Sequence, residues 1–211
     1  MRARAFVLSW AALGLAVPGC VSLKRTPQAR YFVLRSLVEP AAPVTPAKRG
    51  VVGVLPVRLP DHLERPQLVT WAAPGELRID EFLRWGEPLD AGLNRTLAEN
   101  LAALLPESLV VRYPWRSATP PRCRVAAELR VFGLQPNGEV RLEGRWALLA
   151  AHGEHALARG TASFARGPLA SGPAGLDPAV EVDAMSELVA ELGREIAKAV
   201  LALPDAEAAS R

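Results

Sequence analysis

Cys20 is the residue whose surroundings indicate a definite chemical reaction, the acylation of its thiol. The chain opens with the basic stretch Met1-Arg2-Ala3-Arg4 and continues with an apolar run over residues 5–17 that only Ser9 interrupts. A basic start before a short apolar run is typical of a secretion signal, and a run of this length falls short of the about 20 apolar residues that span a bilayer. Val17-Pro18-Gly19-Cys20 follows and resembles a bacterial lipobox, in which the bond before the Cys is cut.

This pattern predicts a signal peptide over residues 1–19 and a lipidated tether over residues 20–29, with palmitate-type chains on Cys20. An ordinary signal-peptidase site, or a buried Cys in a first core helix, are the alternatives. Val21 bears on the destination, because Asp at that position would resemble an inner-membrane retention signal. We therefore expect a lipid anchor in the outer membrane, on its periplasmic face. Stable anchoring needs at least two acyl chains, and bacterial lipoproteins carry three.

The histidines offer two arrangements that could do chemistry. Asp61-His62 could form part of a nucleophilic triad, but no motif places a Ser or Cys beside it. His152 and His155 could ligate a metal, yet positions three apart on a strand point to opposite faces. A helical turn explains the first pair better, and a solvated turn explains the second. We expect no metal and no cofactor.

Two carboxylates near Trp85, Glu81 and Glu87, could act as an acid and base pair, but a surface loop explains them equally well. The sequence also lacks the Gly-rich phosphate loop, the Cys-x-x-Cys pair and the Gly-x-Ser-x-Gly elbow of common catalytic sites. We expect no catalytic residue and no enzyme activity.

Charge and cysteine content limit the remaining classes. Removing Arg2 and Arg4 with the signal peptide leaves 23 basic and 22 acidic residues, a formal charge of +1. No run of Lys or Arg suggests a nucleic-acid footprint, so we expect no nucleic-acid partner. Cys123 has no intrachain partner if Cys20 is acylated, and it lies on the apolar side of an alternating run. We expect a buried structural thiol there.

The elements that position these residues follow from hydrophobic periodicity. Residues 51–57 form a continuous apolar run typical of a central strand, and short strands are expected at 31–34, 67–71 and 76–79. Alternation over 124–134 and 140–148, with the Asn137-Gly138 turn between them and a third run through Phe164, predicts an antiparallel meander.

Two helices complete the prediction. Pro88 is expected as the first residue of a helix that Pro106 closes, and Asp177-Pro178 starts a second helix that Pro204 ends. The sum is one α+β domain over residues 30–204, with about seven strands in a mixed sheet packed against the two long helices, and a flexible tail over 205–211.

Three aromatic residues are candidates for contact with a partner. Trp85, Tyr113 and Trp115 lie near expected loops or strand ends, where amphipathic rings often mark an interface. Packing into the single core is the alternative for each ring.

Six short motifs in order resemble one family. They are Tyr31-Phe32-Val33-Leu34, residues 51–57, residues 59–69, Arg84-Trp85-Gly86-Glu87-Pro88-Leu89, Leu97-Ala98-Glu99-Asn100-Leu101 and Tyr113-Pro114-Trp115. Together they resemble the ABC-type transport auxiliary lipoproteins of the paraquat-inducible protein C type, from about Tyr31 to Val200. Each motif alone is weakly specific, and the order carries the resemblance.

The resemblance implies a domain like the amino-terminal domain of TolB and a non-catalytic role in intermembrane lipid transport. Members are anchored in the outer membrane and work with MCE-domain (mammalian cell entry) proteins, an inner-membrane permease and often an ATPase. The family supplies no catalytic residues. Assembly into a homo-oligomer stays open.

Two other functions compete with this interpretation. An outer-membrane lipoprotein that activates a peptidoglycan synthase would have a similar anchor, but such proteins usually need a long tether. Here about ten residues separate Cys20 from the first expected strand, a reach of roughly 35 Å. A hydrolase that uses Asp61-His62 is the third option, and it predicts that His62→Ala abolishes activity.

Overall fold

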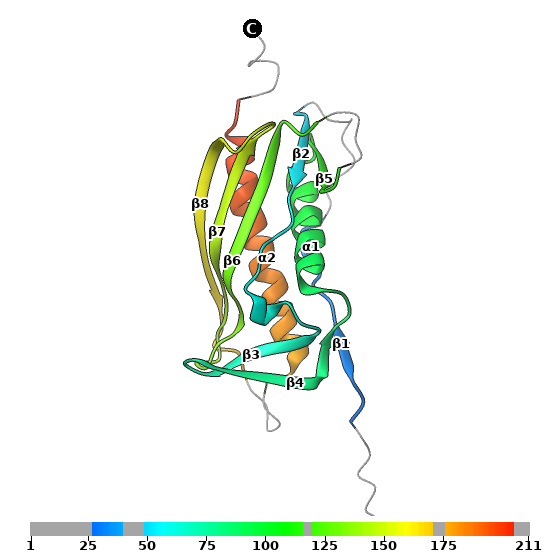
Figure 1. The fold of residues 1–211 in the computed structure, drawn as a ribbon, viewed down its shortest axis with the longest axis vertical. Helices are drawn as coiled ribbons and strands as arrows, with labels where there is room; N and C mark the ends of the chain where they lie inside the picture. The colour runs from blue at the N-terminus through cyan, green and yellow to red at the C-terminus, as the bar shows by residue number, and fades with distance from the viewer. Residues whose placement is uncertain (1–26, 40–48, 116–119, 171–175, 205–211) are drawn as a thin grey trace, which may run out of the picture.

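The structure, a computed structural model, describes residues 27–39, 49–115, 120–170 and 176–204. It confirms the α+β class: two long helices pack against β-sheets in one domain (Figure 1). Cys20, the signal peptide, most of the tether and the tail over 205–211 lie outside the described residues.

A five-stranded sheet with the order β5-β2-β6-β7-β8 forms the larger layer. Strand β2 (Val51–Val54) pairs in parallel with both β5 (Leu109–Arg112) and β6 (Cys123–Leu134). All four residues of β2 are buried, as expected for a central strand. The meander is confirmed, because β6, β7 (Val140–Ala150) and β8 (Ala156–Arg166) pair antiparallel in sequence order.

A second sheet of three strands, in the order β1-β4-β3, differs from the expected single mixed sheet. Strand β4 (Glu76–Trp85) forms a hairpin with β3 (Gln67–Ala73) and continues six residues beyond the expected end at Ile79. Its extension pairs in parallel with β1 (Arg30–Phe32), which keeps β1 out of the larger sheet. The four consecutive exposed residues of β4, 78–81, gave no alternating pattern from which to predict this extension.

Both helices lie on one side of the larger sheet (Figure 1), with α2 (Pro178–Leu201) along β6, β7 and β8 and α1 (Leu89–Leu104) beside β5 and α2. The expected cap of α2 is confirmed: Asp177 accepts a hydrogen bond from the backbone N–H of Ala179 at 3.0 Å, and Pro178 is the first helical residue. Pro88 caps α1 instead of starting it, so α1 begins one residue later than expected.

The core lies between the helices and the inner face of the meander. Alternate residues of β6 are buried, starting with Cys123, and they meet the apolar stripe of α2. Cys123 is fully buried, as expected, and burial raises the pKa of its thiol. The opposite alternates of β6 and β7 form the outer face of the sheet, which no helix among the described residues covers (Figure 1).

Candidate functional site

Trp85, expected at an interface, belongs to the core. It ends β4 opposite Phe32, its side chain is 7% exposed, and its backbone N–H donates to the carbonyl of Pro66 at 2.8 Å. Because the strand continues to this residue, the ring is held against the core instead of on a loop. It lines one side of a pocket of about 450 Å³ between the end of η1 (Asp61–Leu63) and the start of α1.

The structure brings Tyr113 and Trp115 together. Their rings meet edge to face at 5.2 Å, and Tyr113 is 53% exposed. Trp115 packs on β2, where a Cβ at Gly53 would lie 2.9 Å from the indole, so a larger residue at position 53 would displace the ring. This pair follows β5, whereas Trp85 precedes α1, so the three aromatic residues do not form one surface. Contact of any of them with a partner stays a prediction.

The residues singled out for chemistry do not converge. His62, in the expected helical turn η1, packs edge to face on Trp71 with a centroid distance of 5.6 Å. Glu81 accepts a hydrogen bond from Gln67 at 3.0 Å, and Glu87 accepts one from Arg95 at 2.6 Å, so each carboxylate has a separate donor.

His152 and His155 are exposed in the turn between β7 and β8. Among the described residues, no group of three His, Cys, Asp or Glu side chains could hold a metal ion.

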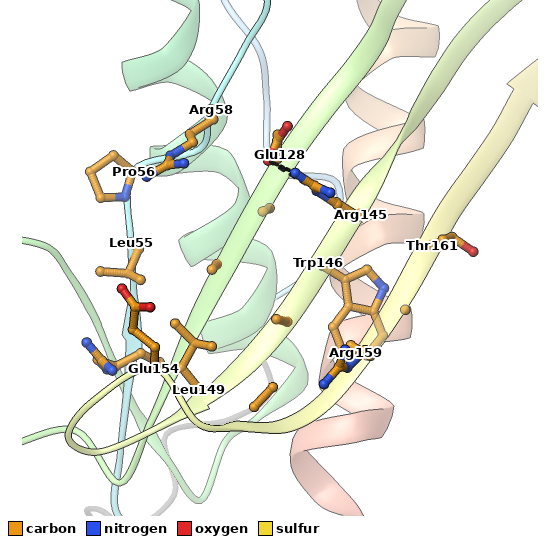
Figure 2. A pocket seen from close by; sticks show the side chains of 16 residues that line it. Leu55, Pro56, Arg58, Glu128, Arg145, Trp146, Leu149, Glu154, Arg159 and Thr161 are labelled. Atoms are coloured by element: carbon orange, nitrogen blue, oxygen red, sulfur yellow. Dashed lines mark hydrogen bonds and ion pairs between the residues drawn. The ribbon is translucent and has the colours of Figure 1, made fainter.

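A groove of about 1100 Å³ runs over the outer face of the larger sheet (Figure 2). Its floor contains Ala126 and Ala147, which are opposite each other on β6 and β7. Longer side chains surround these two methyl groups, and this difference in side-chain length makes the hollow. The groove is lined further by Leu55 and Pro56 after β2, and by Leu149 of β7.

Two of the arginines around the groove have hydrogen-bond partners, and two have none among the described residues. Arg145 donates to Glu128 at 2.9 Å, as Figure 2 shows, and Arg124 donates to the backbone carbonyls of Ala150, at 3.0 Å, and Gly153. Arg58 and Arg159 are exposed and have no side-chain hydrogen bond or ion pair within the described part of the chain.

Sequence reasoning did not find this groove. The signal that could have found it is the alternation of Arg, Ala and Glu at residues 124, 126 and 128, on the solvent side of an otherwise apolar strand.

Glu181 is a second feature that the sequence did not reveal. It lies in the first turn of α2 and is 3% exposed, and its Oε1 has no hydrogen-bond partner among the described residues. Burial raises the pKa of this carboxyl to about 7, and a hydrogen bond from the backbone of Leu134 offsets part of the shift.

None of the helices in the described part of the chain has the length and apolar character needed to cross a bilayer. Fold and site together define an α+β domain with a groove on the face of its larger sheet that lies opposite the helices.

The chain belongs to the family of ABC-type transport auxiliary lipoprotein components, whose family profile matches residues 32–197. The solved structure of an uncharacterised protein has 21% identity and a TM-score of 0.64, and the match covers 82% of this chain and 98% of the other. A Xanthomonas campestris protein of the DUF330 family has 18% identity and a TM-score of 0.64, over 80% of this chain and 93% of the other. These likenesses confirm the fold. No curated protein matches the sequence.

Proposed function

We propose that this protein is a non-catalytic outer-membrane lipoprotein that docks or assists an MCE/ABC-type intermembrane lipid transporter. The observation that carries the proposal is membership of the transport auxiliary lipoprotein family over residues 32–197. A component described as auxiliary to transport supports a binding role over a catalytic one. The lipobox ending at Cys20, with Val21 after it, supports an anchor in the outer membrane.

The short tether supports a role close to the membrane surface. Strand β1 begins at Arg30, about ten residues after Cys20, which gives a reach of roughly 35 Å in a fully extended chain. A domain held this near to the membrane suits the outer-membrane end of a transport assembly. It suits the activator of a peptidoglycan synthase less well, because that activator has to reach across the periplasm.

Recovery of partners from native membranes tests the proposal. A tagged full-length protein, extracted in mild detergent, is expected to bring down an MCE-domain protein together with an inner-membrane permease or its ATPase. An unrelated outer-membrane lipoprotein carrying the same tag is the control for bystander recovery. If neither partner is enriched over the control under several mild extraction conditions, the proposed role is wrong.

A further inference from the structure

The register of the meander gives the groove on the outer face a defined shape. Ala126, Ala147 and Arg159 form one row across β6, β7 and β8. Glu128, Arg145 and Thr161 form the row on one side, and Arg58 extends that row through its bridge to Glu128. The groove therefore crosses the strands, with its floor at the alanines.

Arg124 and Leu149 form the row on the other side of the alanines. Arg124 and Glu128 are four residues apart on β6, so the two bordering rows are about 13 Å apart at the backbone. This width admits a single segment of extended chain.

The length of the groove limits how many residues it can contact. It crosses three strand spacings, from the segment after β2 to β8, which is about 14 Å. An extended chain rises about 3.3 Å per residue, so roughly four residues of a bound segment would lie within it. A small apolar side chain fits against the methyl groups of Ala126 and Ala147.

The charged side chains of the groove indicate which residues a bound segment should carry. Four arginines and two glutamates line it, namely Arg58, Arg124, Arg145, Arg159, Glu128 and Glu154. Arg145 is engaged by Glu128, and Arg124 by backbone carbonyls, whereas Arg58 and Arg159 have no side-chain partner among the described residues. These two exposed guanidinium groups lie near opposite ends of the groove, Arg58 beside β6 and Arg159 on β8 (Figure 2), so a segment that lies along the groove with a carboxylate near each end would pair with both.

We propose that this groove is a docking surface for an extended, acidic segment of about four residues from a partner protein, and, resting on the proposed function, that this partner belongs to the lipid transporter. The alternatives fit less well. The groove is open to solvent along one side, so it would leave an acyl chain partly exposed, and its few apolar side chains cover too little area for a hydrophobic protein interface.

Charge reversal tests the surface. The Arg58→Glu/Arg159→Glu variant of the full-length protein is expected to recover about tenfold less of the MCE-domain protein or permease than the wild type, and added salt should weaken wild-type recovery. The matched control is Arg130→Glu/Arg194→Glu, which changes the net charge equally at exposed sites outside the groove. Recovery that is unchanged in the groove variant, or equally reduced in both, overturns the inference. Thermal unfolding of both variants shows whether they keep the fold.

Photo-crosslinking in intact cells identifies what occupies the groove. With p-benzoylphenylalanine in place of Ala147, the expected product joins this position to an acidic stretch of a transporter protein, and placement at Ser163, outside the groove, is the control. A product with a second copy of this chain, with lipid or with a non-acidic segment overturns the inference, as does the absence of any product. A product with an acidic stretch of a different envelope protein supports the docking surface but contradicts the proposed function.

Discussion

Glu181 shows how one buried carboxyl couples the stability of the domain to pH. Its pKa of about 7 in the folded protein lies above the ordinary value of 4.5, because burial disfavours the charged form. Between these two values the folded state holds a proton that the unfolded state releases. The contribution of Glu181 to stability is therefore complete below about pH 4.5 and is lost as the pH rises through about 7.

Replacement of this carboxyl by an amide is expected to remove that pH dependence. Glu181→Gln should be more stable than the wild type at pH 8, by up to about 3 kcal/mol, and the difference should shrink toward pH 5. Denaturant unfolding of the full-length protein at both pH values measures it. Glu187→Gln, on the exposed side of the same helix, is the control and should not flatten the profile. A wild type and Glu181→Gln that differ equally at pH 5 and pH 8 would contradict the assignment.

At the scale of elements, Gly160 of β8 leaves the space in which Trp146 packs and forms a hydrogen bond with α2. The indole of Trp146 lies over this glycine and donates a hydrogen bond to Glu195 of α2 at 2.8 Å. A Cβ at Gly160 would lie 2.6 Å from the indole ring, so any side chain there must displace Trp146. Arg166 of β8 adds a second link to α2 through Glu187 at 2.9 Å.

Gly160→Ala is expected to lower the free energy of unfolding by about 1–3 kcal/mol, because the ring shifts and its bond to Glu195 is strained or lost. Equilibrium denaturation followed by tryptophan fluorescence measures the change. Thr161→Ala, the next residue and on the outer face, should change stability by less than about 0.5 kcal/mol. If the two variants were equally stable, the packing role of Gly160 would be wrong.

Periodicity predicted the elements that bury one face, and it failed where pairing depends on distant residues. The alternation before and after Asn137-Gly138 gave the β6–β7 hairpin, and the apolar stripe gave α2. Strand β4 is exposed over much of its length and is held by backbone pairing with β1, which is distant in sequence, so neither the second sheet nor the burial of Trp85 was visible. The groove escaped prediction because the sequence pattern does not give the register between strands, and the pairing of Ala126 with Ala147 is what places the two methyl groups side by side.

For the whole molecule, the anchor is the property that the proposed function most requires. Cys20→Ala is expected to lose labelling by radioactive palmitate and to move from the outer-membrane fraction to the soluble periplasmic fraction. Cys123→Ala is the matched control and should keep both label and location, because its thiol is buried in the fold. Growth of both variants with radioactive palmitate, followed by cell fractionation, tests this. A Cys20→Ala protein that is still labelled would contradict the assignment.

Strand β1 and the groove lie toward opposite ends of the domain. Strand β1, the first strand after the proposed anchor, lies in the lower half of Figure 1, whereas the turn that joins β7 to β8 lies at the upper end. The groove occupies the half of the meander nearest to that turn, since it is lined by Arg124, Leu149 and Glu154. If the protein is anchored through Cys20 as proposed, the tether joins the domain at the end that bears β1, and the arginine-lined half lies toward the other end, where a periplasmic partner could reach it.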